Sequence, residues 1–464
     1  MGRKVFISFL GTNNYLETYY SLNGVKSNKS VRFIQDALID FLCKDWNEKD
    51  KILIFYTELS KTKNWENNGH ERVNSEIEKR GLRSTLIAKE LKVQIDEDTI
   101  IPEGFSEEEI WKIFEKVYSK LENGDELYFD VTHAFRSIPL FSIVLFNFAK
   151  TMINTRIISI HYGAFEKLGD AYKVREMPIE DRIAPILDLT SVIRLQELTQ
   201  TANNFIEFGK VGKNSNLIQF PNQNKVLIKK QGQINQAINL LEKNMNLFDD
   251  YLLTCRMSDI KSGKFIKDIR LGLSLVIKSA SPTNPEKTIL KKIEEDLSDF
   301  SSEETDLNIE AAINWALKYN LIQQAYTLGQ EYIISRVCIL LSKYNIYEKY
   351  FDINQKLIKA NKEDIKKKIR ENKIQFRTYV SAVLSISDED IPDGLKGALL
   401  EHKENTLDIL KLGWIHPIRE SFKIIAKNRN ILNHAKGTED AKNIKNAFSK
   451  PYQKCLVIIN EQSC

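Results

Sequence analysis

The sequence lacks the residue patterns that mark several common protein classes. Its 464 residues include five cysteines and no Cys-x-x-Cys pair, which argues against structural zinc and a disulfide framework and indicates a reducing compartment. No hydrophobic run is long enough to span a bilayer, and the N-terminus carries no export or lipidation signal. We therefore expect a cytoplasmic protein that does not enter a membrane.

Signatures of phosphate and metal sites are absent as well. No G-x-G-x-x-G follows the first apolar strand, no G-x-x-x-x-G-K-[ST] occurs, and no H-E-x-x-H or carboxylate metal motif stands out. These absences argue against a dinucleotide dehydrogenase and a P-loop ATPase, and we expect no metal and no required cofactor. The net charge of +4, from 67 basic and 63 acidic residues, is too small to indicate nucleic-acid binding by itself.

Short apolar strands alternate with amphipathic segments up to about residue 180. Predicted strands cover residues 4–10, 51–56, 91–95, 127–131, 156–161 and 172–177. Helical periodicity covers residues 29–43, 70–92, 106–121 and 139–153. Ser106 and Glu109 have the spacing of a capping box at the start of the third helix. The alternation predicts an α/β domain with a Rossmann-like parallel sheet over residues 1–180.

After about residue 181 nearly every segment is helical in period. Helices are predicted over residues 186–208, 235–255, 265–277, 286–297, 309–342 and 364–377, followed by a helical block from 397 to 459. We interpret residues 181–223 as a helical linker and residues 224–464 as an all-α region. No internal repeat is present.

Polar residues follow the first and fourth predicted strands. Rossmann sheets usually order their strands 3-2-1-4, so the carboxyl ends of strands one and four should form a crevice. The predicted ligand-binding residues there are Gly11, Thr12, Asn13, Thr132, His133 and Arg136. A glycine lets a ligand approach the backbone, and an arginine near the start of a helix suits a phosphate. We predict a site for an anionic, planar ligand; the alternative is a histidine that satisfies backbone groups in a turn.

A second candidate site lies near the C-terminus. Apolar residues at 415, 418, 422, 425 and 432 form a helical stripe, and Arg429 fills its one gap. An arginine in an apolar stripe is costly unless it has a partner or a function. His434 follows five residues later, and Asn430 shares its helix face. Because five residues turn a helix by about 500°, the Arg429 and His434 side chains should point about 140° apart. They converge if the arginine swings, if the helix ends before Gly437, or if a second subunit completes the site.

Arginine and histidine together can cleave RNA without a metal ion. Histidine can act as general base on the 2′-hydroxyl or as general acid on the leaving 5′-oxygen. Arginine can stabilise the charge on the phosphate during transfer. The products would carry a 2′,3′-cyclic phosphate and a 5′-hydroxyl. An Arg-x4-His spacing is common by chance, so its place in a C-terminal helical region carries the assignment.

Taken together, the chain resembles the CARF–HEPN ribonucleases of type III CRISPR systems. The segments F-L-G-T-N-N-Y (9–15) and D-V-T-H-A-F-R-S-I-P (130–139) resemble CARF sensor motifs, and R-N-I-L-N-H (429–434) resembles the HEPN Arg-x4–6-His motif. The resemblance implies that cyclic oligoadenylate binds across a CARF homodimer and activates cleavage of single-stranded RNA at a composite HEPN site. It further implies that Arg429 and His434 are catalytic, with Asn430 as a polar helper.

Two other functions remain as alternatives. Sensor domains of this type can carry helix-turn-helix modules, which would make the chain a ligand-gated transcriptional regulator, although no compact basic recognition helix is evident. The sensor could instead degrade its own cyclic oligoadenylate, using groups near Thr12 or Thr132.

Overall fold

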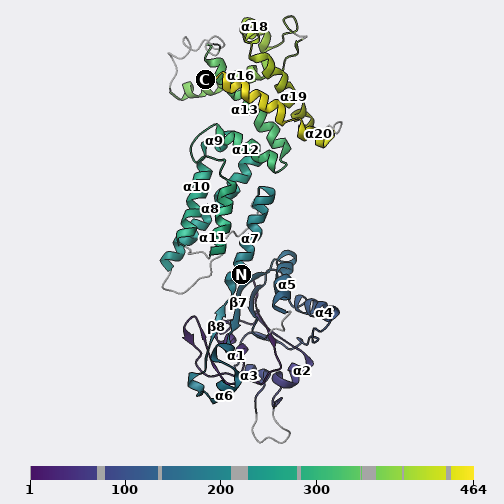
Figure 1. Ribbon diagram of the computed structural model, residues 1–464, viewed down its shortest axis with the longest axis vertical. Coiled ribbons are helices and arrows are strands. Elements are labelled where there is room, and N and C mark those ends of the chain that lie inside the picture. Colours follow the sequence, from purple (N-terminus) through teal and green to yellow (C-terminus); the bar gives the residue numbers. More distant parts are fainter. Residues whose placement is uncertain are drawn as a thin grey trace. The chain divides into compact units, whose positions relative to one another are not determined.

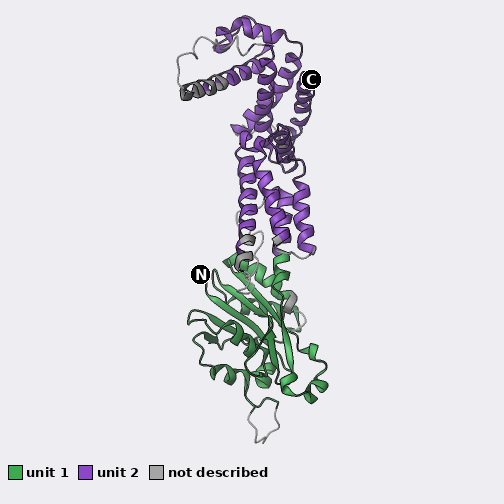
Figure 2. Ribbon diagram, turned by 90° about the vertical axis from the view of Figure 1, so that its left-hand side faces the viewer, with its two compact units in different colours: residues 1–196 green, residues 197–464 purple. Residues whose placement is uncertain are grey.

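The computed structural model describes residues 2–70, 79–133, 138–210, 228–279, 284–344, 346, 362–388, 391–434 and 440–463. It divides into two units, residues 1–196 and 197–464, coloured green and purple in Figure 2. The division therefore falls after residue 196, whereas the sequence placed a boundary at 180. Residue 223, the other predicted boundary, lies outside the described residues. Figure 1 labels the helices and strands of both units.

One sheet runs through the first unit. Its described strands are β1 (Lys4–Leu10), β2 (Tyr19–Leu22), β3 (Val25–Lys26), β4 (Lys51–Tyr56), β5 (Gln94–Asp96), β6 (Glu126–Asp130), β7 (Arg156–Gly163) and β8 (Ile183–Asp188). Their order is β3-β2-β8-β7-β6-β1-β4-β5. The stretch from β7 to β5 is parallel throughout, while β8 runs antiparallel to β7. The predicted 3-2-1-4 order is confirmed as β5-β4-β1-β6.

Helices cover both faces of this sheet. The helical elements of the first unit are α1 (Ile34–Leu42), α2 (Glu58–Ser60), η1 (Lys61–Trp65), α3 (Leu82–Ile87), α4 (Glu107–Tyr118), α5 (Ile138–Ile153), η2 (Phe165–Leu168), α6 (Ala171–Glu176), η3 (Ile179–Asp181) and the start of α7 (Thr190–Phe208). Successive side chains of a strand point to opposite faces. Accordingly, Phe6 and Leu10 of β1 share a core with α1 and α3, while Val5 and Ile7 share one with α4 and α5.

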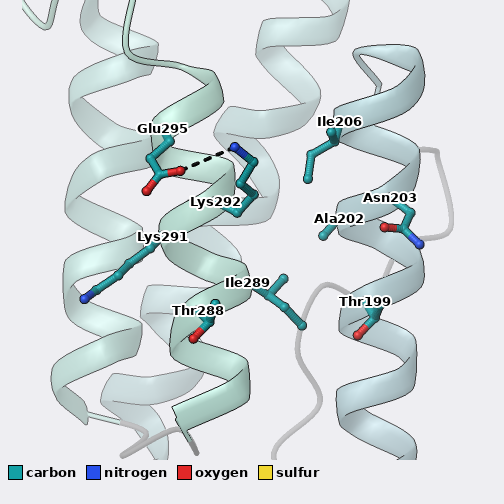
Figure 3. A pocket seen from close by; sticks show the side chains of 9 residues that line it. All are labelled: Thr199, Ala202, Asn203, Ile206, Thr288, Ile289, Lys291, Lys292 and Glu295. Atoms are coloured by element: carbon teal, nitrogen blue, oxygen red, sulfur yellow. Dashed lines mark hydrogen bonds and ion pairs between the residues drawn. The ribbon is translucent and has the colours of Figure 1, made fainter.

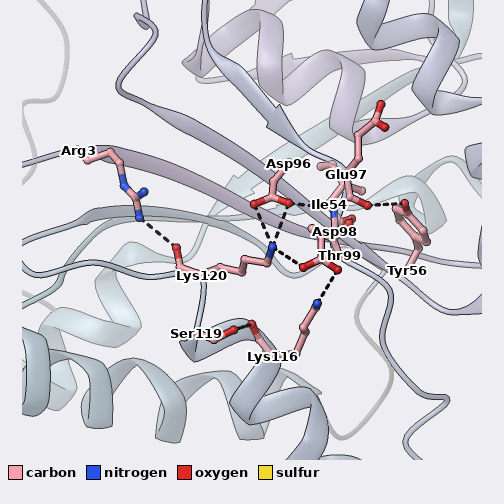
Figure 4. Close-up of polar contacts among 10 residues, drawn as sticks. All are labelled: Arg3, Ile54, Tyr56, Asp96, Glu97, Asp98, Thr99, Lys116, Ser119 and Lys120. Carbon is pink, nitrogen blue, oxygen red and sulfur yellow. Dashed lines mark hydrogen bonds and ion pairs between the residues drawn. The ribbon is translucent and has the colours of Figure 1, made fainter.

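Ion pairs connect the edge strand β5 to the C-terminal end of α4 (Figure 4). The Lys120 ammonium lies 3.1 Å from a carboxylate oxygen of Asp96 and 2.9 Å from one of Asp98, and Lys116 lies 2.7 Å from Asp98. The Asp98 carboxylate is 75% exposed, and ion pairs to such an exposed group contribute little to stability individually. Charged side chains at a sheet edge do oppose pairing with a further strand.

The cap of α4 is close to the predicted one. The Ser106 side chain accepts a hydrogen bond from the backbone N–H of Glu109, as a capping box requires. The Glu109 carboxylate accepts from the backbone N–H of Phe105 (2.8 Å) rather than from that of Ser106. The acidic first turn also suits the positive end of the helix dipole.

Two predictions about the end of the first unit were wrong. Residues 172–177, predicted as a strand, form helix α6, because the Asp170 side chain accepts from the N–H groups of Tyr172 and Lys173 and so starts a helix. Residues 183–188, whose second half was assigned to a long helix, form strand β8, and α7 begins only at Thr190.

The hairpin of β2 and β3 was missed. Asn23 and Gly24 connect its strands with φ values of 50° and 80°. Both angles are positive, as a type I′ turn requires, and Asn-Gly is the usual sequence for such a turn. The signal was therefore present in the sequence.

The described part of the second unit contains helices and no strand. Its helices after α7 are α8 (Ile228–Leu253), α9 (Met257–Ser262), α10 (Lys264–Ser279), α11 (Asn284–Asp296), α12 (Leu307–Lys318), α13 (Ile322–Ser342), α16 (Lys362–Ser385), α17 (Ala398–Glu401), α18 (Lys403–Lys411), α19 (Ile415–Asn433), α20 (Ala441–Asn446) and α21 (Ser449–Glu461). The predicted single helix 309–342 is two helices, because Asn320 adopts φ 58° between α12 and α13. None of the described helices has both the length and the apolar character of a membrane span.

Candidate functional site

The carboxyl ends of β1 and β6 lie side by side, as the strand order requires. The register pairs Ile7 with Phe129, so the loops that follow the two strands meet. At Gly11 an added Cβ atom would lie 2.3 Å from Tyr15 Oη and 3.5 Å from His133 Cβ. A larger residue at position 11 would therefore require the Tyr15 side chain to shift. The structure thus brings Gly11 and His133 together, two of the residues predicted to share a crevice.

His133 stacks on Tyr15 at this strand end. Their ring centroids lie 4.3 Å apart with an interplanar angle of 29°, and Phe33 packs against the edge of Tyr15. Burial lowers the pKa of His133 to about 4, and burial raises the pKa of Tyr15 above its ordinary value. At neutral pH the imidazole is therefore uncharged and the phenol protonated. The pair offers hydrogen bonds and a flat surface rather than positive charge.

The hydroxyl of Thr132 is engaged within the fold. It donates to the Asp130 carboxylate and accepts a hydrogen bond from the backbone N–H of Gly163 at 2.8 Å. The Thr132 N–H also donates to Asp130 at 3.0 Å. These bonds connect the end of β6 to β7, so the Thr132 side chain shapes the crevice.

A buried polar network lies beneath the crevice. The Asp130 carboxylate accepts from the Ser8 hydroxyl at 2.7 Å, and the Gln35 amide donates to the Ser8 hydroxyl at 3.1 Å and to the carbonyl of Phe9 at 3.0 Å. Burial raises the pKa of Asp130, and its hydrogen bonds from Thr132 and Ser8 act in the opposite direction. Because these groups span β1, β6 and α1, they fix the two strand ends against each other.

Asn64 holds the loop after β1 in place. Its amide donates to the carbonyls of Gly11 (2.8 Å) and Asn13 (3.0 Å), and its side-chain oxygen accepts from Arg32 Nη2 (2.9 Å). Asn64 lies in η1, far along the chain from the loop, and nothing in the sequence marked it. Tyr15, in contrast, belongs to the segment 9–15 that the sequence singled out, although no role was predicted for it.

Two cationic side chains lie at this loop. Arg32 reaches it through Asn64, and Lys79 Nζ donates to the side-chain oxygen of Asn14 at 2.9 Å. Of the other predicted residues, Thr12 is half-buried and the Asn13 side chain is exposed. Arg136 lies outside the described residues.

Arg429 and Asn430 lie in the last turns of α19, and His434 is the residue that caps its C-terminal end. Arg429 is half-buried, and its Nε atom is buried without a hydrogen-bond partner. Asn430 and His434 are exposed, and the His434 N–H donates to the Asn430 carbonyl at 3.0 Å, which ends the helix. Within the described residues, no hydrogen bond joins Arg429 to His434.

The apolar stripe of α19 is filled differently from the prediction. Asn428, which is 5% exposed, takes the core position that was assigned to Arg429. The fully buried arginine of this helix is Arg419, which bonds the carbonyl of Ile386 at 2.6 Å and pairs with Asp388 at 2.8 Å. A helical step of three residues from Ile425 leads to Asn428, whereas the predicted step of four leads to Arg429.

A cavity and a cluster of possible metal ligands in the second unit contain none of the residues that the sequence predicted for a functional site. A cavity of about 370 Å³ lies between α7 and α11 (Figure 3), lined by Thr199, Ala202, Asn203, Ile206, Thr288, Ile289, Lys291, Lys292 and Glu295. Asp388, His416 and Glu420 could offer ligand atoms within 4.8 Å of one another. All three are exposed, and Asp388 is paired with Arg419 and Lys423, which offset the negative charge that a cation needs.

The first unit matches a known domain family. Residues 5–166 match the family model described as CRISPR system endoribonuclease Csx1, CARF domain. Over 142 residues the chain is 30% identical to the CRISPR-associated protein MJ1674 of Methanocaldococcus jannaschii, covering 30% of this chain and 20% of that protein. The chain thus spans about a fifth of the length of the curated relative it matches.

These similarities support a CRISPR-linked protein with a CARF-type, ligand-sensing N-terminal domain, followed by a mostly helical region. The family match ends at residue 166. The roles predicted for Arg429, Asn430 and His434 therefore rest on the sequence motif alone.

Proposed function

We propose that this chain is a CRISPR-associated endoribonuclease that cleaves single-stranded RNA when a cyclic oligoadenylate binds its N-terminal domain. The observation that carries the catalytic part is Arg429, a half-buried guanidinium with a buried Nε and, among the described residues, no hydrogen-bond or ion-pair partner. A desolvated cation without a counter-charge is stabilised by an incoming anion such as a phosphate. The CARF match supports the sensing part.

The proposed reaction needs no metal ion. The ribose 2′-oxygen attacks the adjacent phosphorus, and the bond from phosphorus to the 5′-oxygen breaks. The His434 of one copy accepts the 2′-hydroxyl proton, and that of a second copy donates a proton to the 5′-oxygen. Arg429 stabilises the added negative charge on the phosphate, and Asn430 lies beside it on the exposed side of α19. The products carry a 2′,3′-cyclic phosphate and a 5′-hydroxyl.

The strand-end crevice is the proposed activator site. His133 is neutral and offers hydrogen bonds to a base, and the exposed Asn13 side chain offers more. Arg32 and Lys79 place positive charge at the same loop, where the phosphates of a ring would lie. Neutral groups for bases beside cations for phosphates suit a cyclic oligonucleotide.

An apolar stripe on α5 supports a homodimer. Val144, Phe148 and Met152 are 56%, 40% and 55% exposed, and their spacing of four places them on one helix face. Phe114 of α4 packs against Phe148 and carries the surface on to the exposed Trp111. A twofold interface uses the same patch on both copies, and a single apolar stripe can pack against itself. Helix α5 follows the crevice residues directly in the chain, so pairing there would bring two activator sites near each other.

An RNase assay tests the proposal. Purified full-length protein is mixed with labelled single-stranded RNA in EDTA, with and without cyclic tetra- or hexa-adenylate. We expect one of these two cyclic oligoadenylates to raise the cleavage rate. The products should end in a 2′,3′-cyclic phosphate. Arg429→Ala and His434→Ala should each lower the stimulated rate at least 100-fold, because each removes a group that acts in the transition state, while the affinity for the ring stays unchanged.

His416→Ala is the matched control, because it removes an exposed histidine from the same helix. Cleavage at the wild-type rate by both the Arg429 and the His434 variant would contradict the catalytic assignment. A ring that is linearised while RNA stays intact would instead favour the ring-degrading alternative. A sequence-specific footprint on duplex DNA would favour a transcriptional regulator.

A further inference from the structure

A buried tyrosine hydroxyl lies beneath the end of α19. Tyr326 of α13 has no exposed surface, and Asn428 of α19 is 5% exposed. The Tyr326 hydroxyl donates to the backbone carbonyl of Ile444 in α20 at 2.7 Å. It accepts a hydrogen bond from the side-chain amide of Asn428 at 3.1 Å. One hydroxyl therefore joins three helices.

These two bonds flank the candidate catalytic residues. Asn428 directly precedes Arg429, and Ile444 follows His434 in α20. The segment that carries Arg429 and His434 is thus held at both ends by the same hydroxyl. The Tyr326 hydroxyl therefore links the last turns of α19 to α20.

The start of α13 makes parallel contacts to the same two segments. The Gln323 amide donates to the side-chain oxygen of Asn433 at 3.1 Å, one residue before His434. On the other side, Lys445 of α20 donates to the side-chain oxygen of Asn320, which directly precedes the first turn of α13. Position 320 and the first turns of α13 therefore contact the chain before and after the candidate catalytic pair.

Packing fixes the position of the tyrosine itself. Its ring lies edge-on to Phe448 with centroids 4.8 Å apart. Gly329, one turn further along α13, leaves space for the Phe448 ring, since an added Cβ would lie 2.6 Å from it. Because the ring cannot shift freely, loss of the hydroxyl leaves the Asn428 amide and the Ile444 carbonyl buried without this partner.

We propose that Tyr326 and Asn428 are positioning residues for RNA cleavage: they orient Arg429 and His434 without contacting RNA. This inference rests on the proposed function of the same helix end. Catalytic groups need placement to within a fraction of an ångström, and a shift of about 1 Å can cost about 100-fold in rate.

The test compares Tyr326→Phe with Tyr332→Phe. Tyr332 lies on the same helix, is equally buried, and donates its hydroxyl to Glu310 of α12 at 2.8 Å, away from α19. Both variants lose one buried hydroxyl, so we expect similar falls in melting temperature. Only Tyr326→Phe should lower the kcat measured with cyclic oligoadenylate, by about 10- to 100-fold. The KM for RNA and the affinity for cyclic oligoadenylate should stay unchanged.

Asn428→Ala provides a second, independent variant, and it decides the matter if Tyr326→Phe does not fold. It should lower kcat as Tyr326→Phe does, and the double variant should be no slower than the slower single one, because both changes break the same link. Equal kcat values for wild type, Tyr326→Phe and Asn428→Ala would overturn the inference and leave the proposed function standing. Absence of ring-stimulated cleavage in the wild type would overturn both.

Discussion

At the scale of single residues, burial shifts the pKa values of an imidazole at the crevice and of a carboxyl group beneath it in opposite directions. Asp130 is covered by the fold and its pKa is raised by burial, while the pKa of His133 is lowered by burial. Both shifts favour the uncharged form of the group. In the proposed activator site, the positive charge for an anionic ligand would come from Arg32 and Lys79, which lie at the loop after β1, and from Arg136, which the sequence predicts.

The pKa of His133 leads to a prediction about acid stability. Between its ordinary value near 6.5 and its folded value of about 4, the unfolded chain binds a proton at His133 that the folded chain does not. The stability that this residue contributes is complete above pH 6.5 and is lost as the pH falls through that window. Between pH 7.5 and pH 4.5 this effect should lower the free energy of unfolding of the wild type by about 2–3 kcal/mol. The His133→Gln protein should not show this decrease.

Urea unfolding of wild type and His133→Gln at the two pH values measures this effect. The pKa of the buried His161 is also lowered and that of Asp130 raised, but both groups are present in each protein, so the comparison isolates His133. His416→Gln, on an exposed histidine, should follow the wild type. If the stability difference between wild type and His133→Gln does not change with pH, His133 is not held as a buried neutral imidazole.

At the scale of helices and strands, local pattern predicted most of the first unit and little of its site. The runs at 4–10 and 51–56 are mainly apolar because both faces of the sheet are covered, and they were predicted with the observed boundaries. Residues 172–177 alternate apolar and polar side chains like a strand, yet Tyr172 is 71% exposed and the Asp170 cap makes the segment helical.

Long-range contacts explain what the sequence could not provide. Asn64 touches the Gly11 loop only because β4 lies beside β1, and no periodicity encodes that contact. Asn428 and Arg429 are neighbours in the chain, and which of them faces the core depends on where α13 lies. Such details require the positions of elements that are far apart in sequence.

The apolar stripe of α5 yields a prediction about assembly. Phe148→Glu places a charge in the centre of the stripe, so that pairing of two copies would bury two like charges. We expect the proposed dimer to dissociate at micromolar protein concentration and the cleavage stimulated by cyclic oligoadenylate to fall at least tenfold. Light scattering coupled to size-exclusion chromatography measures the mass, and the RNase assay measures the consequence.

Ile87→Glu is the control, because Ile87 on α3 is 57% exposed but belongs to a different face of the first unit. Single exposed apolar side chains are ordinary on protein surfaces, so this change should leave the mass and activity of the protein unaltered. A Phe148→Glu protein with the wild-type mass would mean that the α5 stripe is not the dimer interface.

At the scale of the whole molecule, the proposal joins two sites that lie in different units. Ring binding at the end of β1 and β6 and RNA binding at the end of α19 must be linked by one free energy of coupling. That coupling acts equally in both directions at equilibrium. If the ring tightens RNA binding by some factor, RNA must tighten ring binding by the same factor.

The His434→Ala protein allows this reciprocity to be measured, because it should bind RNA without cutting it. We expect the ring to lower the Kd for single-stranded RNA by about 5- to 100-fold, the usual range for allosteric coupling. Single-stranded RNA at saturation should lower the Kd for the ring by an equal factor. Two unequal factors would mean that cleavage or a change of oligomeric state had entered the equilibrium. If both factors equal one while cyclic oligoadenylate still activates cleavage by the wild type, the coupling acts in the transition state alone, which is where the Tyr326 contact is proposed to act.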